Sequence, residues 1–436
     1  MRETLVKTEE FKDSPVGRIP KDWEVSSLAS LTQYITYGFT NPMPTTKDGP
    51  WMITAFDIAD GKICYGQARH TSEKAYKNDL TQKSKPNLGD ILITKDGTLG
   101  RIAVVDRTGI CINQSVACLR PLLDTDVRFL FHYLRSDIGQ ERMLADAGGS
   151  TIKHIYITKL AQMEVPVPPR EERTRISDIL DTIDEAIAHT SSLIAKLKQM
   201  KAGLLHDLLT RGLDENGELR DAIAHPEQFK DSPLGRIPKD WEILPLTSLT
   251  QYITYGFTNP MPTTKDGPWM ITAFDIADGK IFYEQARHTS EKAYKNDLTQ
   301  KSKPDLGDIL ITKDGTLGRI AVVDRIDICI NQSVACLRPL PDTDVKFLVH
   351  YLRSEQGQER MLADAEGSTI KHIYITKLAQ MEVPIPLREE ARKISDILDS
   401  HNTRIRTEEA YRDKLKLQKQ GLMHDLLTGK VRVKDA

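Results

Sequence analysis

The sequence has no long apolar segment and almost no excess of charge of one sign. No run of apolar residues approaches the length that crosses a membrane, and residues 1–10 are too polar for a secretory leader. The 60 Lys and Arg residues nearly balance the 62 Asp and Glu residues, so the formal net charge is −2. We therefore expect a cytoplasmic protein without membrane contact. Total charge does not indicate a polyanionic partner.

Cysteine is scarce and is not arranged for metal binding or disulfides. The cysteines have no C-x-x-C spacing, and their odd number disfavours a disulfide framework. They are Cys64, Cys111, Cys118, Cys329 and Cys336. We predict free, buried thiols in a protein from a reducing compartment.

Motifs for nucleotide or methyl-donor chemistry are also missing. There is no phosphate-binding Gly-x-x-x-x-Gly-Lys-Ser/Thr segment. Asn41-Pro42-Met43-Pro44 is similar to the Asn-Pro-Pro-aromatic motif of adenine methyltransferases, but it lacks the aromatic residue that stacks on a flipped base. No glycine-rich strand-turn-helix precedes it, so the segment does not indicate a methyltransferase.

Few side chains could hold a metal ion. A nuclease site could use Asp305, Asp344 and Lys346, but a first copy of this region, described below, has Asn87 and Arg128 at the matching places. Without this carboxylate the first copy would have too few ligands to bind a metal ion. His206-Asp207 and His424-Asp425 offer too few ligands at their spacing. A standalone DNA methyltransferase or nuclease remains the alternative function, and we assign no catalytic residue, no metal and no cofactor.

What the sequence does contain is a long internal repeat with a constant offset of 218 residues. Between Phe11 and Arg175, 21 of 165 positions differ from the second copy. In the segment that follows, 176–213, only 18 of 38 positions agree. The near-identical parts are expected to be domains that do the same job. The divergent segments are expected to contact each other, as unlike partners that must fit together.

The divergent segments predict two long helices, 170–213 and 388–436 with its C-terminal tail. Pro168 and Pro169 precede the first, acidic residues fill its first turn, and Gly212 is a suitable stop. Its apolar residues recur at steps of three, four or seven residues, with Thr190 at the one weak position: Leu180, Ile183, Ile187, Ile194, Leu197, Leu204 and Leu208. Such a narrow stripe favours pairing with another helix, although each helix could instead pack on its own globular domain.

The globular parts are predicted to be mixed α/β (α+β) domains. They span 1–169 and 214–387, and the second range includes the linker. Strands are expected over 52–56, 90–94, 101–105 and 110–119, and a helix over 127–144. The linker 211–228 reaches about 60 Å at most when extended, which places the second domain most easily at the far end of the first helix. We therefore expect an antiparallel coiled coil and approximate twofold symmetry.

Several segments together carry a family resemblance. They are 17–24 (GRIPKDWE), 89–100 (GDILITKDGTLG), Asn113-Gln114, the Pro-Pro-x-Glu-Glu start of the first long helix, and 424–433. Most occur twice, although Pro386-Leu387 replaces the proline pair in the second copy. The chain closely resembles the specificity subunit of type I restriction-modification systems over essentially its whole length.

The resemblance implies two target-recognition domains, each reading one half of a split site in double-stranded DNA. It implies that the long helices set the spacing and bind two methyltransferase (modification) subunits, with restriction (translocase/nuclease) subunits joining through the complex. It implies a scaffold without catalysis of its own. A coiled-coil adaptor with no DNA role would leave the basic, loop-rich twin domains unexplained.

Candidate DNA contacts follow from local charge and loops. Basic residues outnumber acids seven to four between Arg69 and Arg101 and could bind phosphates, while Thr and Lys in two loops could enter a groove. Asn113 and Gln114 could read adenine, but we expect a structural role in a strand. The candidates in the first copy are Thr45, Thr46, Lys47, Arg69, Lys74, Lys77, Lys85, Lys95, Arg101, Thr151, Lys153 and His154. Those in the second copy are Thr263, Thr264, Lys265, Arg287, Lys292, Lys295, Lys303, Lys313, Arg319, Thr369, Lys371 and His372.

Overall fold

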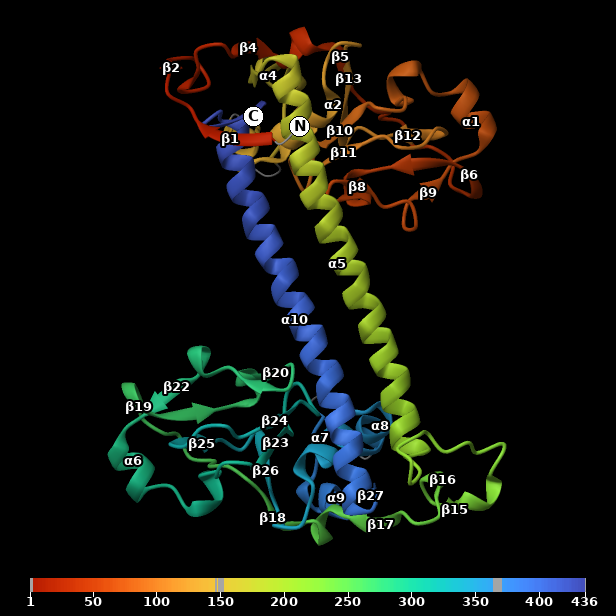
Figure 1. Cartoon of the computed structure of the whole chain (residues 1–436), viewed down its shortest axis with the longest axis vertical. Helices are drawn as coiled ribbons and strands as arrows, with labels where there is room; N and C mark the ends of the chain where they lie inside the picture. Colours follow the sequence, from red (N-terminus) through yellow and green to blue (C-terminus); the bar gives the residue numbers. More distant parts are fainter. Residues whose placement is uncertain (1–2, 146, 148–152, 364–370, 436) are drawn as a thin grey trace. The chain divides into compact units, whose positions relative to one another are not determined.

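The chain divides into two compact units in the computed structural model, which describes residues 3–145, 147, 153–363 and 371–435. The first unit is Met1–Ser192 with Glu409–Ala436, and the second is Leu193–Glu408. Each unit holds one globular domain, the first half of the long helix that follows this domain, and the second half of the other long helix (Figure 1).

Two sheets form the globular part of the first unit. The larger is antiparallel with the strand order β11-β10-β13-β5, and the smaller has the order β12-β6-β9 with β12 parallel to β6. Their bounds are β5 Thr32–Tyr37, β6 Thr46–Ile53, β9 Arg69–His70, β10 Ile91–Thr94, β11 Ile102–Val104, β12 Ile110–Ile112 and β13 Val116–Pro121. Strand pairs β2 (Phe11–Lys12) with β3 (Ile19–Pro20), β4 (Glu24–Ser27) with β14 (Glu164–Val167), and β7 (Ile58–Ala59) with β8 (Lys62–Ile63) complete it.

Three consecutive residues of strand β10, Ile91, Leu92 and Ile93, are apolar because both faces of the sheet are covered. Side chains alternate across a strand, and here both faces of the sheet are covered. Ile91 and Ile93 pack with the helices and Trp23, while Leu92 packs with Ile53 and other residues of the smaller sheet. All of these residues are fully buried.

Helices cover one face of the larger sheet. They are α2 (Val127–Arg135), α3 (Asp137–Ala145), α4 (Ile157–Gln162) and α5 (Arg170–Thr210), while α1 (Glu73–Asn78) lies beside β6. The helix expected over 127–144 is thus interrupted at Ser136, whose Oγ accepts the amide of Gly139 at 3.1 Å. This hydrogen bond starts a new helix after a short break.

The second unit repeats this plan. Its larger sheet has the order β18-β26-β23-β24, and its smaller sheet has β22-β19-β25. The strands are β15 Phe229–Ser232, β16 Gly235–Pro238, β17 Glu242–Pro245, β18 Thr250–Tyr255, β19 Thr263–Ile271, β20 Ile276–Ala277, β21 Lys280–Ile281, β22 Arg287–Thr289, β23 Ile309–Thr312, β24 Ile320–Val322, β25 Ile328–Ile330, β26 Val334–Pro339 and β27 Glu382–Ile385. The helices are α6 Glu291–Asn296, α7 Val345–Arg353, α8 Glu355–Ala363, α9 Ile375–Gln380 and α10 Arg388–Leu427.

The long helices pair antiparallel, as the narrow apolar stripe predicts. In the first unit, Ile176 and Leu180 near the start of α5 share a core with Leu426 near the end of α10. In the second unit, Ile394 and Leu398 of α10 share a core with Leu208 of α5. The same residues also pack on the globular domains, so the two packing modes that the sequence leaves open occur together.

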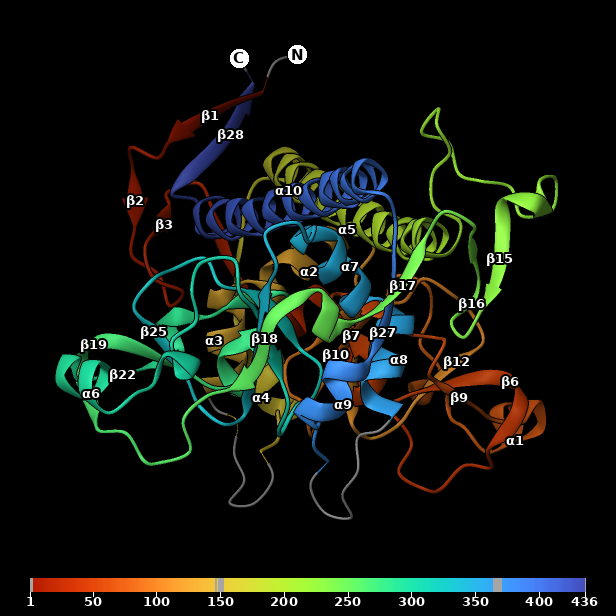
Figure 2. The ribbon, with the colours of Figure 1, turned by 90° about the horizontal axis from the view of Figure 1, so that it is seen from below.

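The ends of the helices are fixed by specific residues. Helix α5 ends at Thr210, and Gly212 follows with φ +63, the left-handed conformation that favours glycine after a helix. After α10, strand β28 (Val431–Asp435) pairs antiparallel with β1 (Glu3–Lys7), so the chain ends meet in a two-stranded ribbon (Figure 2). Trp23 and Trp241 are fully buried.

Two sequence-based expectations about strands are wrong. The strand expected over 110–119 is divided into β12 and β13, which belong to different sheets, so Asn113 and Gln114 form a turn instead of lying within a strand. Strand β6 spans Thr46–Ile53, so it begins and ends earlier than the strand expected over 52–56, and its register with β9 shifts between Thr46 and Trp51.

The cysteines are free, as expected. Four are buried and Cys64 is half-buried. Burial raises the pKa of Cys111 to about 12, so this thiol stays protonated and unreactive near neutral pH. Among the described helices, none is long and apolar enough to cross a membrane.

Candidate nucleic-acid interface

The turn between β12 and β13 is held by its own side chains. Asn113 Oδ1 accepts hydrogen bonds from the Ser115 amide at 3.1 Å and from Ser115 Oγ at 2.6 Å. Ser115 Oγ in turn accepts the amide of Ala55 at 3.0 Å. The Asn113 side chain therefore shapes the turn, as expected of a structural residue, while the neighbouring Gln114 is exposed.

Two further loops are fixed to this turn. The amide of Lys95 donates to the carbonyl of Ser115 at 2.9 Å, and the amide of Ile155 donates to the carbonyl of Lys95 at 3.0 Å. Asp96 joins the loops through its side chain, because its Oδ1 lies 2.6 Å from His154 Nδ1 and its Oδ2 lies 2.8 Å from Lys95 Nζ. His154 and Lys95, two candidates from separate segments of the sequence, are thus neighbours.

The ionisation of Asp96 supports this arrangement. Burial opposes its charge, but hydrogen bonds from His154 and Lys95 outweigh burial and hold the pKa of the carboxyl below its usual value. An ionised Asp96 can accept a hydrogen bond from Nδ1–H of His154, which leaves Nε2 of the ring available for another hydrogen bond.

An exposed aromatic residue lies on the fourth loop at this turn. Phe56 is 81% exposed, although its backbone is tightly fixed. Thr54 and Asp57 form a capping box around the turn of 3-10 helix at 55–57, and Gln67 Nε2 donates to the Phe56 carbonyl at 2.9 Å. An exposed aromatic ring on a fixed backbone can stack on a planar group such as a base.

Together these loops form a candidate recognition face, called the recognition face below, which we define as Phe56, Lys95, Asp96, Gln114 and His154. Tyr37 extends it, because Lys95 Nζ lies 5.4 Å from the centre of the Tyr37 ring and this ring is 46% exposed. The face combines basic, amide and aromatic groups, which suit phosphates, base edges and base stacking.

The second unit carries the same face. Phe274 is 86% exposed, Lys313 Nζ lies 2.8 Å from Asp314 Oδ2, and His372 Nδ1 hydrogen-bonds Asp314 Oδ1. Ser333 Oγ again links the turn to the aromatic loop, accepting the amide of Ala273 at 3.0 Å. The sequence repeat is therefore accompanied by the same side-chain contacts in both faces.

The candidate residues from the sequence fall into two groups in each unit. One group lies at or next to the recognition face: Lys95, Arg101, Lys153 and His154, with Lys313, Arg319, Lys371 and His372 in the second unit. The other lies around the smaller sheet and its helix: Thr45, Thr46, Lys47, Arg69, Lys74, Lys77 and Lys85, with Thr263, Thr264, Lys265, Arg287, Lys292, Lys295 and Lys303. Thr151 and Thr369 lie outside the described residues.

Some of these candidates already have partners in the protein. Lys85 Nζ lies 5.1 Å from the centre of the Tyr76 ring and donates to the carbonyl of Lys77. Arg101 Nη1 donates to the carbonyl of Ile58 at 3.1 Å. By contrast, Lys153 and Lys74 are exposed.

Sequence reasoning missed Phe56 and Tyr37. Exposed aromatics cannot be told from core aromatics by residue type, and Phe56 stood at the end of an expected strand. The capping box, Thr54 with Asp57 three residues later, was the available signal that a turn begins there.

The residues considered for catalysis have structural contacts. Asp305 binds Arg338 at 2.7 Å, Lys346 binds Asp399 at 2.9 Å, and Asp344 caps α7. Within the described ranges, no three His, Cys, Asp or Glu residues gather in a way that could hold a metal ion.

Comparison with known proteins decides the family. The family model described as the type I restriction modification DNA specificity domain matches residues 20–199 and again residues 238–417. The chain belongs to this family. The resemblance seen in the sequence motifs is therefore confirmed, and each match covers one globular domain with the first part of its long helix.

Specificity-domain relatives align over nearly the whole chain. The putative type I restriction enzyme MjaX specificity subunit of Methanocaldococcus jannaschii is 26% identical, with 98% of each chain covered. The EcoBI specificity subunit of Escherichia coli is 26% identical over 86% of this chain and 78% of its own length. A crystal structure of the type I restriction-modification S subunit from M. genitalium has a TM-score of 0.54, 19% identity, and 95% and 96% coverage, so the fold is shared.

Proposed function

We propose that this chain is the DNA specificity subunit of a type I restriction-modification complex. One observation carries the proposal: two matching specificity domains present the same face of basic, amide and aromatic side chains, and each domain leads into a long helix. Each recognition face reads one half of a split DNA target, and the length of the paired helices sets the unread spacer.

The partners follow from the family. Specificity subunits of type I systems assemble with methyltransferase and restriction subunits and bind DNA. We propose that two methyltransferase subunits dock on the paired helices of this chain, and that catalysis resides in them. Methylation-sensitive sequencing of a host genome with and without this gene tests the proposal. Loss of one split methylation motif supports it, and an unchanged set of methylated motifs contradicts it.

The two groups of candidate residues can be separated by salt dependence. Lys153→Ala with Lys371→Ala removes two exposed cations next to the recognition faces. If both lysines contact phosphate, the slope of log affinity against log salt falls by about 2, with no change in the preferred sequence. Lys74→Ala with Lys292→Ala removes the same charge from the other group and should leave the slope unchanged. A larger effect of the Lys74 pair, measured by fluorescence anisotropy, would place DNA on the smaller sheet instead.

The exposed phenylalanines give a second test of the recognition face. Phe56→Ala with Phe274→Ala should weaken DNA binding by roughly 2 kcal/mol or more, the usual size for an aromatic anchor at an interface. The unfolding temperature should not change, because these rings are 81% and 86% exposed. Leu88→Ala with Leu306→Ala is the matched control, since both leucines are about 60% exposed but lie away from the face. Equal effects of the two pairs would argue against a specific role for the rings.

A further inference from the structure

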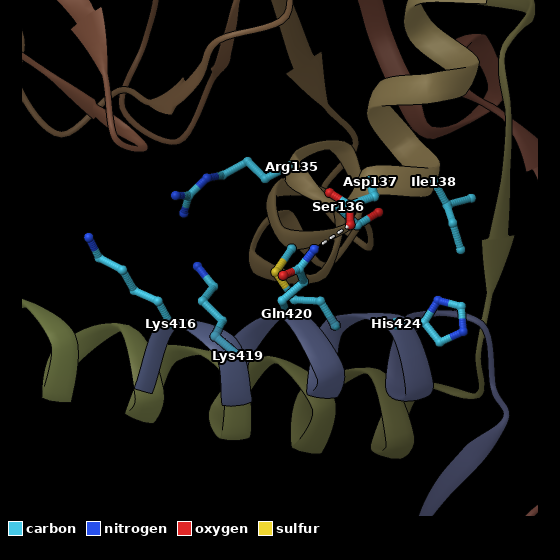
Figure 3. Close-up of a pocket in the computed structure, with 9 residues that line it drawn as sticks. Arg135, Ser136, Asp137, Ile138, Lys416, Lys419, Gln420 and His424 are labelled. Atoms are coloured by element: carbon cyan, nitrogen blue, oxygen red, sulfur yellow. Dashed lines mark hydrogen bonds between the residues drawn. The ribbon is translucent and has the colours of Figure 1, made fainter. Parts of the chain in front are cut away.

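The two units differ at one polar contact between the long helices. In the first unit, Lys419 of α10 donates to both oxygens of Asp184 of α5, at 2.6 and 2.7 Å. Arg135 of α2 lies 3.5 Å from the same carboxylate. Figure 3 shows Lys416 and Lys419 extending from α10 toward the side of the pocket that carries Arg135. Lys419 is only 9% exposed, so Asp184 neutralises a largely buried cation.

The repeat replaces the neutralising group in the second unit. Lys201 and Arg353 match Lys419 and Arg135, but Asn402 stands where the first unit has Asp184. Arg406 stands where the first unit has Ala188. The second unit therefore has one carboxylate fewer and one guanidinium more at the same place.

In the second unit, Lys201 and Arg353 hold the places of Lys419 and Arg135, which both contact Asp184 in the first unit, and the charge of Arg406 acts on both of them. Lys201 is half-buried, and the charges that act on it, those of Arg353, Arg406 and Lys198, are all positive. Arg353 donates through Nη2 to the carbonyls of Gly279 at 2.9 Å and Ile320 at 3.0 Å. Asp399 lies near Arg353, but its oxygens are 2.9 Å from Lys346 Nζ and 3.0 Å from His350 Nε2.

Burial and neighbouring cations disfavour the charged forms of Lys201 and Arg353. Burial and the nearby charges of Arg353 and Arg406 lower the pKa of Lys201. Burial and the charge of Arg406 likewise lower the pKa of Arg353 despite the attraction of Asp399. Partly buried cations without a counter-charge lose hydration and repel each other, so a bound anion would stabilise them.

We propose that Lys201, Arg353 and Arg406 form an oxyanion-binding site in the second unit. Its ligand is a carboxylate or phosphate group that takes the place of the carboxylate that Asp184 supplies in the first unit. Two guanidinium groups and one ammonium suit the planar or tetrahedral arrangement of such oxygens. Arg406 is exposed and Lys201 half-buried, so a ligand can reach the site from solvent. The inference does not depend on what the recognition faces bind.

The test uses the full chain and inorganic phosphate as probe. Calorimetric titration at constant ionic strength should show one saturable phosphate site in the natural chain. Asn402→Asp should bind phosphate roughly tenfold more weakly, because the new carboxylate takes the donors in the same charge-assisted way as Asp184. It should also raise the unfolding temperature. Asn402→Gln, which adds no charge, should bind like the natural chain.

A second variant tests the same idea in the first unit. Asp184→Asn should create an additional phosphate site there, weaker than the first because Ala188 supplies no third cation. If Asp184→Asn does not fold, the phosphate affinities of the Asn402 variants still test the proposed site. No saturable binding by the natural chain, or equal phosphate affinity of natural chain and Asn402→Asp, overturns the proposal.

The source of the oxyanion is distinguished in the assembled complex. If an acidic side chain of the methyltransferase subunit fills the site, the complex no longer binds phosphate, and Asn402→Asp weakens assembly. If the complex binds phosphate as the free chain does, a free phosphate group is the ligand. Either result supports an oxyanion site.

Discussion

Arg432→Ala is expected to destabilise the first unit by roughly 3–5 kcal/mol, the usual cost of removing one partner of a buried ion pair. The Arg432 guanidinium binds both oxygens of Glu172, each at 2.6 Å, and both oxygens of Asp22, at 2.9 and 2.7 Å. Glu172 is 5% exposed. Without Arg432 this carboxylate keeps, among the described residues, the indole of Trp23 at 3.1 Å and the amide of Val433 at 3.3 Å, and a buried charge is left without a cation.

The molecule contains its own control for this prediction. Hydrogen exchange of residues 19–37 should increase in the variant, while exchange of the matching residues 237–255 in the second unit should stay the same. Arg220→Ala should give the reverse pattern, because Arg220 binds Glu390 at 2.6 and 3.2 Å and Asp240 at 3.0 Å. If Arg432→Ala leaves the exchange pattern unchanged, solvent or other groups compensate the charge of the Glu172 carboxylate, and the prediction is wrong.

The ion pairs of Glu172 and Glu390 could be predicted only in part from the sequence. Glu172 and Glu390 are 218 residues apart and could be matched from the repeat, but Arg220 and Arg432 are 212 residues apart. The two arginines come from unlike segments, a linker and a strand, that follow the two helices. Aligning the two copies therefore does not match Arg220 with Arg432. Each arginine reaches its glutamate from a different kind of segment.

Other features could be predicted to different degrees. The repeat and the apolar stripe are sufficient to predict the twin domains and the antiparallel helices, because both depend on regular spacing. The recognition face depends instead on hydrogen bonds between loops far apart in sequence, such as those of Ser115 with Ala55 and Lys95. His154 and Lys95 were selected for their chemistry, but their common carboxylate, Asp96, could be identified only from coordinates.

The second large effect concerns the DNA target, which we predict to be an inverted repeat interrupted by an unread spacer. Only 21 of 165 positions differ between the two domains, and the side-chain contacts of the recognition face recur in both units. Domains with the same face should read the same short sequence. Because the helices pair antiparallel, we expect the two domains to meet the duplex in opposite orientations, and symmetric readers require symmetric half-sites.

The helices should set the spacer. They are 41 and 40 residues long, which corresponds to about 60 Å. Half-site centres roughly 34–36 Å apart, one turn of DNA, would allow both domains to read one face of the duplex. Deleting one heptad from each helix, 188–194 together with 406–412, should shorten the spacer and leave both half-sites unchanged. A change in the half-sites themselves would mean that the helices also position the reading loops.

The methylated consensus from a genome that carries this system measures the symmetry directly. The substitutions most able to break it are Cys64 to Phe282 and Gly66 to Glu284, because they change size or charge near the recognition loops. Both precede β9 or β22 and lie outside the recognition face as defined by Phe56, Lys95, Asp96, Gln114 and His154. Gly148, which matches Glu366, falls outside the described residues. If these positions do not read bases, the two half-sites are identical in opposite orientation. Two unrelated half-sites would show that one of these substitutions, and not the shared face, determines the sequence that is read.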